Sequence, residues 1–198
     1  MKTLISIIGN IKTGKSTIAN LLSSEMNLPV FNFESYRAKC ELIYKGKNST
    51  LPQNVWDVLT ADIKKQDIAI LDSSGVSINE PKIYGYFEHK VIIRLDCPRD
   101  LSWSRLNNEF QKMQTPAGSK ISFSHYDGMM DRRAQALRNI KYDFVFDTKK
   151  LSSETIVGEI RTILELIIAD NIISESKKVN PNTSKIKSLW QQVFKGGV

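Results

Sequence analysis

One segment near the start of the chain limits its fold more than any other, because it joins a strand, a glycine loop and a helix. Residues 3–8 are almost wholly apolar without strict alternation, as in a strand buried on both faces of a parallel sheet. The next residues match the pattern G-x-x-x-x-G-K-[ST] at each fixed position, with a threonine after it: Gly9, Asn10, Ile11, Lys12, Thr13, Gly14, Lys15, Ser16 and Thr17. Residues 18–22 begin an amphipathic helix. This order predicts an α/β fold in which the loop binds phosphate groups.

The residue types of the loop suit a nucleoside triphosphate. Consecutive backbone N–H groups and the positive end of the helix converge on phosphate oxygens in such a loop. Gly9 and Gly14 allow a close approach that side chains would block. Lys15 is expected to reach the β- and γ-phosphates, and the Ser16 hydroxyl to complete the coordination of Mg²⁺. We therefore predict ATP and Mg²⁺ as cofactors.

Further apolar runs alternate with segments of helical spacing along the chain. The runs at 30–33, 68–71, 91–95 and 144–146 bring the number of predicted strands to five. Helical spacing is present at 16–25, 34–44, 55–65, 99–113, 126–139 and 154–168. Such alternation predicts a doubly wound five-stranded parallel sheet, with ligands at the carboxyl ends of the strands.

Length and patterning predict one domain with a short appendage. At 198 residues the chain can bury one substantial core, which we place at residues 1–173, with a polar lid segment at about 107–125. Residues 174–183 have the composition of a linker. An amphipathic helix is predicted at 184–198, and it packs on the domain, docks to a partner protein, or contacts lipid or nucleic acid. Its apolar face consists of Ile186, Leu189, Trp190, Val193 and Phe194.

The composition limits which binding partners and which cellular compartment are expected. The net charge is +7, and residues 171–198 hold five lysines against one acid. This excess favours polyanions such as nucleotides, DNA or RNA. Cys40 and Cys97 lack the spacing of a disulfide scaffold or zinc site, which predicts a reducing cytoplasm. No apolar run reaches the roughly 18–20 residues that a membrane span needs.

A carboxylate ends the third predicted strand. Asp72 follows the buried run 68–71, where an acid helps to position Mg²⁺ in phosphate-loop proteins. Because Ser73-Ser74-Gly75 follows, the alternative is a helix cap or a turn residue. The chain contains no Asn-Lys-x-Asp sequence for guanine recognition, which argues against a GTPase.

Later segments resemble the shikimate kinase and nucleoside monophosphate kinase group. The resemblance covers residues 1 to about 168 and implies that the predicted domain at 1–173 is a P-loop kinase domain. The similar segments are residues 91–100, Arg105 in a helix before the lid, Asp131-Arg132-Arg133, and residues 142–148. The resemblance implies that Arg105 lies against the adenine. It also implies that Arg132 or Arg133 returns to the transferring phosphate, and a solvated helix face is the alternative for each arginine.

The acceptor side departs from that group. In the families that the chain resembles, an acid after the second strand contacts the acceptor hydroxyl and a later arginine anchors its anionic group, which implies these roles for Glu34 and Arg37. A carboxylate that stabilises a helix start is the alternative for Glu34. Shikimate kinases have Asp-x-Asp where this chain has Asn32 and Glu34, and a glycine triplet where it has residues 73–75. Shikimate is therefore not the expected acceptor.

We accordingly predict an ATP-dependent kinase that acts on a hydroxyl of a nucleotide-like acceptor. The open classes are a free nucleoside or nucleotide, a small hydroxylated metabolite, and a hydroxyl on nucleic acid. Viral kinases of hydroxymethylated uracil in DNA are similar in size and basicity, and four aromatic residues are candidates for a DNA-facing rim: Trp56, Trp103, Tyr84 and Tyr86. The alternatives of another class are an NTP-dependent switch and an NTP-binding subunit of a DNA-processing assembly.

Overall fold

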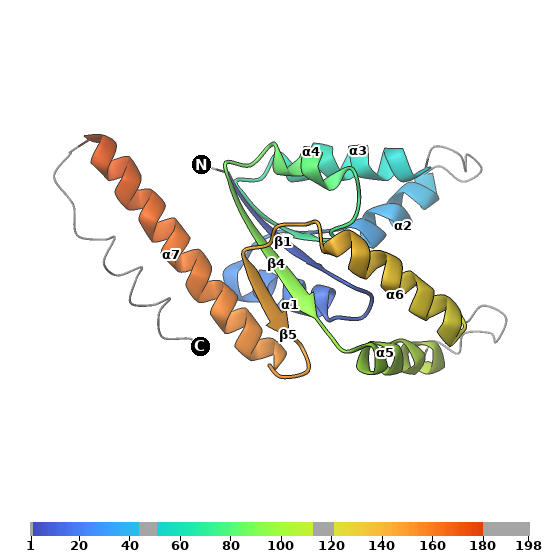
Figure 1. Cartoon of the computed structure of the whole chain (residues 1–198). Coiled ribbons are helices and arrows are strands. Elements are labelled where there is room, and N and C mark those ends of the chain that lie inside the picture. The colour runs from blue at the N-terminus through green and yellow to red at the C-terminus, as the bar shows by residue number, and fades with distance from the viewer. Residues whose placement is uncertain (1, 44–50, 113–120, 180–198) are drawn as a thin grey trace. The chain divides into compact units, whose positions relative to one another are not determined.

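A parallel β-sheet flanked by helices forms the domain (Figure 1). The structure is a computed structural model that describes residues 2–43, 51–112 and 121–179. The strands are β1 (Thr3–Gly9), β2 (Val30–Asn32), β3 (Ile68–Asp72), β4 (His89–Asp96) and β5 (Phe144–Asp147). The helices are α1 (Lys15–Met26), α2 (Phe33–Ile43), α3 (Leu51–Ile63), α4 (Glu80–Tyr84), α5 (Arg99–Lys112), α6 (Phe123–Leu137) and α7 (Ser153–Val179).

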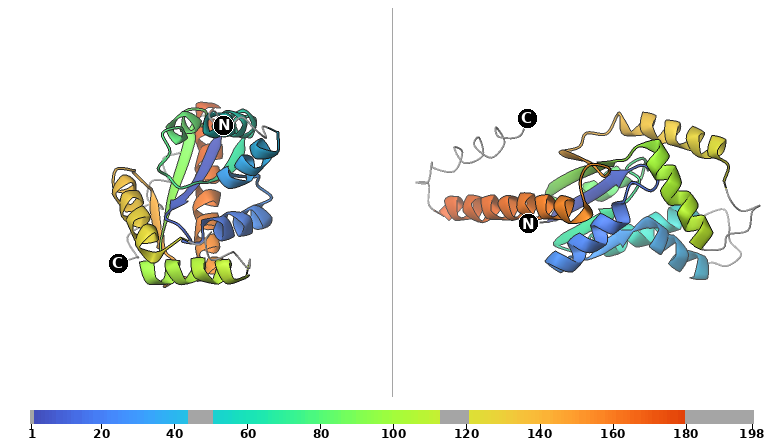
Figure 2. Two further views of the ribbon diagram at one scale, coloured as in Figure 1. Left: turned by 90° about the vertical axis from the view of Figure 1, so that its right-hand side faces the viewer. Right: turned by 90° about the horizontal axis from the view of Figure 1, so that it is seen from below.

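The strand order confirms the predicted doubly wound sheet. The five strands pair in parallel in the order β2-β3-β1-β4-β5, so that β1 lies in the centre. Seen from below in Figure 2, α1 and α6 lie on opposite sides of the strands. The register pairs Ile7 with Asp72 and Gly9 with Leu95. The carboxyl ends of β1 and β3 therefore meet at one edge, which is where ligands bind in such sheets.

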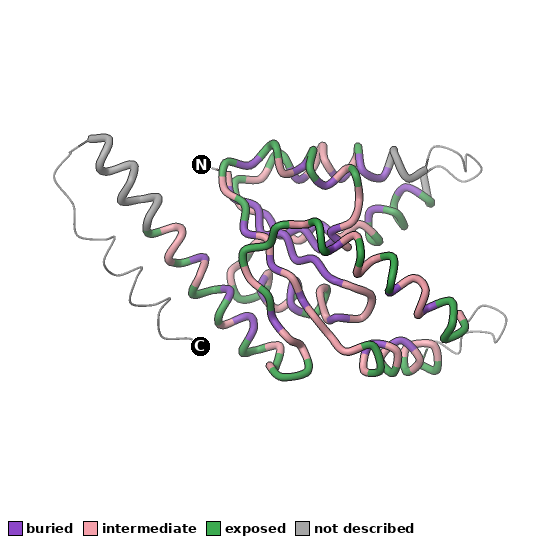
Figure 3. Tube along the Cα trace, in the orientation of Figure 1, coloured by how far each residue is buried: buried purple, intermediate pink, exposed green. Residues whose placement is uncertain are grey.

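Burial explains why these runs form strands. All seven residues of β1 are buried, and buried positions continue along β3 and β4 (Figure 3). A strand covered on both faces needs apolar side chains at consecutive positions, as the sequence indicated. On the side of α2, α3 and α4, one apolar cluster fills the space against the sheet: Leu4, Phe31, Tyr36, Cys40, Val55, Trp56, Leu59, Ile63, Ala69, Leu71, Ile83 and Phe87.

A second, smaller apolar cluster joins α5 to α6. Leu106 of α5 packs with Tyr126 and Met130 of α6, and Ile11 of the phosphate loop contacts the same cluster. The predicted lid at 107–125 contains the end of α5 and the start of α6, and residues 113–120 lie outside the described part of the chain. The cluster therefore connects the phosphate loop with both helices that border the predicted lid.

The structure differs most clearly from the sequence-based expectations at two places. α4 was not predicted, because five residues with one proline are too short to show helical spacing. α7 continues to Val179, so residues 174–179 are helical where a linker was predicted. Glu175, Lys177 and Lys178 are good helix formers, and their polarity was mistaken for a linker signal. The predicted helix at 184–198 lies outside the described residues.

Compact packing divides the chain into two units, Met1–Gly158 and Glu159–Val198. The sheet and the phosphate loop belong to the first unit. Within the described residues, no helix is both long enough and apolar enough to span a membrane.

Gly9 occupies a position that tolerates no side chain. Its φ of 150° lies in the region that favours glycine. A Cβ added there would lie 2.5 Å from the Leu95 carbonyl oxygen and 2.9 Å from Thr13 Oγ1. Because the Leu95 carbonyl belongs to the paired strand β4, it cannot move without disturbing the sheet.

We predict that Gly9→Ala lowers the free energy of unfolding by roughly 1–3 kcal/mol, through backbone strain and overpacking. Urea denaturation without nucleotide measures this change. Gly158→Ala is the matched control, because a Cβ at Gly158 meets no heavy atom within 4 Å and alanine favours a helix. Equal stabilities of the two variants would contradict the steric explanation.

Candidate active site at the phosphate loop

The phosphate loop leads from β1 into α1 in the geometry that the sequence predicted. Gly14 precedes the helix with a left-handed φ of 95°, so its backbone turns directly into the first turn of α1. The Lys15 ammonium donates to the Asn10 carbonyl at 2.7 Å, and the buried Thr13 hydroxyl donates to the same oxygen at 3.0 Å. These two hydrogen bonds tie the side chains of Thr13 and Lys15 to the backbone of the loop, so the Lys15 side chain is held against the loop.

Burial sets the electrostatics of Lys15. It lowers the pKa of the ammonium to about 8, because desolvation penalises the charged form. Asp72 opposes this shift, whereas the charges of Arg133 and Lys12 add to it. Three cationic groups thus share one small region. Phosphate oxygens would relieve their mutual repulsion, so the site suits a polyanion.

Asp72 and Ser16 form an oxygen pair at the edge of the sheet. The Ser16 hydroxyl donates to Asp72 Oδ2 at 2.6 Å, and the Asn32 amide donates to the same oxygen at 2.6 Å. Asp72 is 3% exposed. Hydroxyl and carboxylate oxygens are ligands that Mg²⁺ accepts, and it keeps its remaining positions for water and phosphate. The pair therefore fits the predicted metal role, although the described residues contain no cluster of three or more His, Cys, Asp or Glu.

A cleft of about 640 Å³ opens beside this pair. Its phosphate end is formed by the loop and the start of α1. Its other end is formed by the start of α2, by α3 and by the segment between β3 and α4. The residues that line the cleft are Ile11, Lys12, Gly14, Lys15, Ser16, Thr17, Asn32, Phe33, Glu34, Trp56, Asp72, Ser73, Ser74, Val76, Ser77, Glu80 and Arg133.

The structure separates the two candidate arginines of α6. Arg133 lines the cleft, whereas Arg132 is exposed and is not among the lining residues. Burial lowers the pKa of the Arg133 guanidinium, and the charge of the Glu34 carboxylate, which also lines the cleft, opposes that shift. Arg133 and Glu34 are therefore brought together at the site, and Arg132 is not.

Arg37 is not brought to the cleft with Glu34. Its side chain is 54% exposed and pairs along α2 with Glu41 at 2.8 Å and Glu34 at 3.7 Å. Residues three and four apart on a helix face one another, so these pairs fix Arg37 on the surface of α2. The predicted anchor for an anionic acceptor group is therefore absent from the lining residues at this position.

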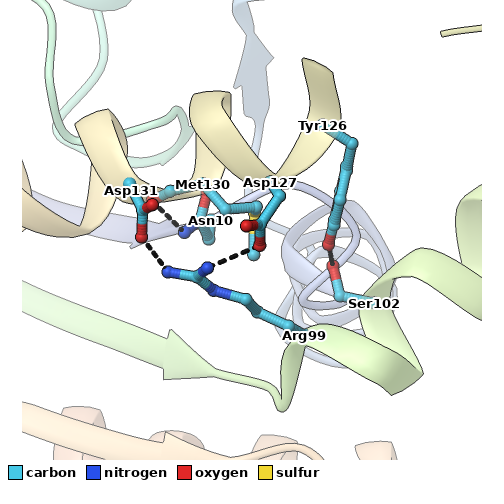
Figure 4. Close-up of polar contacts among 7 residues, drawn as sticks. All are labelled: Asn10, Arg99, Ser102, Tyr126, Asp127, Met130 and Asp131. Atoms are coloured by element: carbon cyan, nitrogen blue, oxygen red, sulfur yellow. Dashed lines mark hydrogen bonds and ion pairs between the residues drawn. The ribbon is translucent and has the colours of Figure 1, made fainter. Parts of the chain in front are cut away.

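Three contacts hold α5, α6 and the phosphate loop in one arrangement, and Figure 4 draws two of them, Asn10 with Met130 and Tyr126 with Ser102. The Asn10 amide donates to the Met130 carbonyl at 3.4 Å, which joins the loop to α6. The Tyr126 hydroxyl donates to the Ser102 hydroxyl at 2.6 Å, and Ser102 in turn donates to the Ile11 carbonyl. α6 is thereby tied to the loop both directly and through α5.

Arg99 adds an ionic link between the same two helices. Its guanidinium extends from the start of α5 between two carboxylates of α6, those of Asp127 and Asp131 (Figure 4). The two acids lie one turn apart and face the same side of α6. This link and the hydrogen bonds to the loop fix the helix that carries Arg133.

Arg105 lies in a second hollow on the other side of the loop. Its guanidinium donates to the Lys12 carbonyl at 3.1 Å and to the Thr148 carbonyl at 3.3 Å. A cavity of about 300 Å³ adjoins it, lined by Lys12, Thr13, Gly14, Thr17, Ile18, Arg105, Thr148, Leu151, Ser153 and Ile156. The position beside the loop is compatible with contact to a nucleotide base, which stays a prediction.

The predicted aromatic rim does not assemble. Trp56 lines the cleft and packs on Phe33 with ring centroids 4.7 Å apart. Trp103 packs on Tyr126 between α5 and α6, and the Tyr84 hydroxyl bonds to Ser6 at 3.0 Å. Tyr86 is exposed beside the Lys64 ammonium, so the four aromatic residues serve different parts of the molecule.

The sequence analysis missed Glu80, which is 1% exposed and lines the cleft. It carried only a weak signal, because an acid before a proline is typical of a solvated helix start. Burial raises its pKa to about 7, while Ser73, the backbone of Ser77 and Gly75, and Tyr84 oppose the rise. The inward direction of this side chain depends on the path of the chain after β3.

Comparisons with known proteins agree with this fold and loop. No family model matches the chain. Shikimate kinase of Staphylococcus aureus (strain Newman) is 25% identical over 174 residues, which cover 83% of this chain and 95% of that protein. A Bacillus subtilis YorR protein, solved with phosphorylated GDP, is 18% identical and has a TM-score of 0.58, covering 84% of this chain and 98% of its own. Deoxyadenosine kinase from M. mycoides is 16% identical, with a TM-score of 0.55 over 83% and 99%.

The relatives and the solved neighbours confirm the predicted class. They include shikimate kinase and deoxyadenosine kinase, and the solved neighbours share the fold described above. The chain is accordingly a P-loop phosphotransferase in fold and in phosphate loop. The acceptor is not fixed by these similarities.

We predict that the raised pKa of Glu80 makes stability fall as the pH rises. Because the folded protein holds this proton up to about pH 7 and the unfolded chain releases it near 4.5, the stabilising contribution is full below pH 4.5. It is lost as the pH passes 7. The free energy of unfolding, measured by urea denaturation between pH 4.5 and 8, should fall more steeply for the wild type than for Glu80→Gln. Parallel profiles would contradict the assignment.

Proposed function

We propose that this P-loop kinase transfers the γ-phosphoryl group of ATP to a hydroxyl of a small, nucleotide-like acceptor bound in the 640 Å³ cleft. The observation that carries the proposal is the convergence of three groups on that cleft: Lys15, the Ser16–Asp72 oxygen pair, and Arg133. Phosphoryl transfer needs positioning and charge neutralisation more than covalent chemistry, and these groups supply both.

The chain's own residues account for the reaction step. Lys15 and the loop N–H groups bind the β- and γ-phosphates, and Arg133 faces the position where negative charge develops. Glu34 orients the acceptor hydroxyl and takes its proton as the oxygen bonds to the γ-phosphorus. The bond from that phosphorus to the bridging oxygen breaks, and ADP is released with the electron pair.

Ser16 and Asp72 are the residues that would hold Mg²⁺. When bound, Mg²⁺ neutralises phosphate charge and orients the β- and γ-phosphates for in-line transfer. The 2.6 Å hydrogen bond between the two oxygens keeps them together before nucleotide binds, and Asn32 restrains the carboxylate further. Asp72 is therefore assigned to the metal, which leaves Glu34 for the acceptor.

The acceptor class is supported by the cleft wall rather than by a motif. Trp56 and Phe33 pack on each other in the cleft wall, and Glu34, the residue after Phe33, also lines the cleft. A nucleoside fits this combination, as does a small hydroxylated metabolite. A hydroxymethylated pyrimidine in DNA fits only if the base is extruded from its stack, because the cleft accepts a monomer. The DNA acceptor is kept as one arm of the test.

An NTP-dependent switch is the alternative of another class. It would bind ATP with the same loop and transfer phosphate to no acceptor. The presence of both Arg133 and Glu34 in the cleft lining favours transfer, because a switch has no use for an acceptor base.

We predict label transfer from [γ-³²P]ATP with Mg²⁺ to at least one acceptor in a panel of nucleosides, nucleotides, sugars, and DNA with and without hydroxymethylpyrimidine. Lys15→Ala should reduce the rate about a hundred-fold or more, because it removes the cation that binds the transferring group. Label only in DNA would select the nucleic-acid acceptor. Nucleotide binding without transfer to any acceptor would favour the switch.

We also predict that the two neighbouring arginines differ in function. Arg133→Ala should lower kcat by roughly ten- to a hundred-fold or more, because its charge faces the transferring group. Arg132→Ala is the matched control and should change kcat less than about two-fold, since an exposed charge contributes little. Steady-state kinetics with the identified acceptor measures both. A larger effect of Arg132→Ala would reverse the assignment.

A further inference from the structure

Two buried polar atoms in the acceptor part of the cleft have no hydrogen bond of normal geometry to any described residue. Glu80 Oε1 accepts from the Gly75 N–H at 3.2 Å, but Oε2 has no partner among the described residues. The Ser73 hydroxyl is also buried. It lies close enough to the Glu80 carboxyl to oppose the rise of the Glu80 pKa, but it makes no hydrogen bond of normal geometry with that carboxyl or with any other described residue. Both residues line the main cleft. Buried polar atoms are nearly always paired, so two unpaired atoms in one cleft indicate a ligand that pairs them.

The third unpaired buried atom of the described residues does not share this position. Thr3 Oγ1 lies at the start of β1, at the end of the sheet opposite the phosphate loop, and is not part of the cleft lining. Glu80 and Ser73 come instead from the segment that follows β3, directly beyond Asp72. They therefore lie on the acceptor side of the metal-binding pair.

The charges along the cleft indicate the chemistry of that ligand. The lining cations are Lys12, Lys15 and Arg133, and two of them belong to the phosphate loop. The segment after β3 contributes hydroxyl groups and the Glu80 carboxyl. Arg37 is held on the surface of α2 by Glu34 and Glu41. An anionic group on the acceptor would therefore meet carboxyl groups and hydroxyls on this wall.

From this wall we infer that Glu80 and Ser73 form a subsite for neighbouring hydroxyl groups on the ring of an uncharged acceptor, with Trp56 packing on the ring. The inference rests on the proposed kinase function and names its acceptor class. A carboxyl and a serine hydroxyl both accept from and donate to hydroxyl groups, so they suit a diol. Ser73 directly follows β3 and Glu80 begins α4, so the two side chains together would fix the position of the ring. That position would decide which hydroxyl reaches Glu34.

The neutral form of Glu80 in the free protein agrees with this role. Burial favours the uncharged carboxyl, which avoids a stranded charge in the empty cleft. Two classes of compound carry such a ring, nucleosides and sugars. Both present neighbouring hydroxyl groups without an anionic group. The experiment separates them from each other and from anionic acceptors.

The test compares matched pairs of acceptors, adenosine with AMP and glucose with gluconate, in the ATP-dependent transfer assay. We expect at least one uncharged member to have a kcat/KM about ten-fold or more above its anionic partner. Glu80→Ala should raise the KM of that acceptor roughly ten- to a hundred-fold, as for loss of a hydrogen-bonded carboxyl group, and leave the KM of ATP unchanged. Ser73→Ala should have a smaller effect in the same direction.

Glu88→Ala is the matched control, because this exposed carboxylate lies before β4 and outside the cleft lining, and it should leave both KM values unchanged. Glu80→Gln keeps the shape of the side chain, so it replaces Glu80→Ala in the test if the alanine variant does not fold. It should retain part of the acceptor affinity. A preferred anionic acceptor, or an acceptor KM that neither Glu80 variant changes, would overturn the subsite while the kinase function stands.

Binding separates failure of the subsite from failure of the kinase function. If the wild type transfers phosphate to no compound, calorimetric titration of the same four compounds with a non-hydrolysable ATP analogue decides the matter. Binding of an uncharged compound that Glu80→Ala abolishes would support the subsite without a kinase. Binding of none of the uncharged compounds would overturn it.

Discussion

The position of β1 between β3 and β4 is the constraint on which the rest of the molecule depends. Because all seven residues of β1 are buried and its neighbours are parallel, the loop after Gly9 can only emerge beside the ends of those two strands. The pairing of Ile7 with Asp72 then sets Asp72 within 2.6 Å of Ser16 Oγ. A shift of one residue in this register would turn Asp72 to the other face of the sheet and remove the oxygen pair.

The site is built from groups that oppose the stability of the empty protein. Lys15 is buried beside two other cations, and Glu80 and Ser73 each hold a polar atom that makes no hydrogen bond of normal geometry to the described residues. Each feature is unfavourable until a ligand supplies the missing charge or hydrogen bond. Groups that destabilise the ligand-free protein in this way are expected at functional sites. Here they divide the cleft into a cationic part for phosphates and a part with carboxyl and hydroxyl groups for the acceptor.

The helices beyond the sheet carry one of the cleft's three cations, and they are attached to the phosphate loop rather than to the sheet alone. Asn10 bonds to α6, Ser102 of α5 bonds to the loop, and Arg99 bridges the two helices. Arg133 therefore keeps its position relative to Lys15 through short, local links. A change of the loop on binding phosphates would be transmitted to α6 by the same contacts.

The sequence by itself determined the phosphate loop, the five strands and the position of Asp72, because each is a local pattern of burial or backbone geometry. It left open which of Arg132 and Arg133 faces the cleft, and it assigned Arg37 to the acceptor, whereas the structure pairs this side chain with Glu34 and Glu41 along α2. It missed Glu80, whose local pattern is that of a solvated helix start. Only the tertiary structure decided these points, because the direction of a side chain on a helix depends on the rotation of that helix against distant segments.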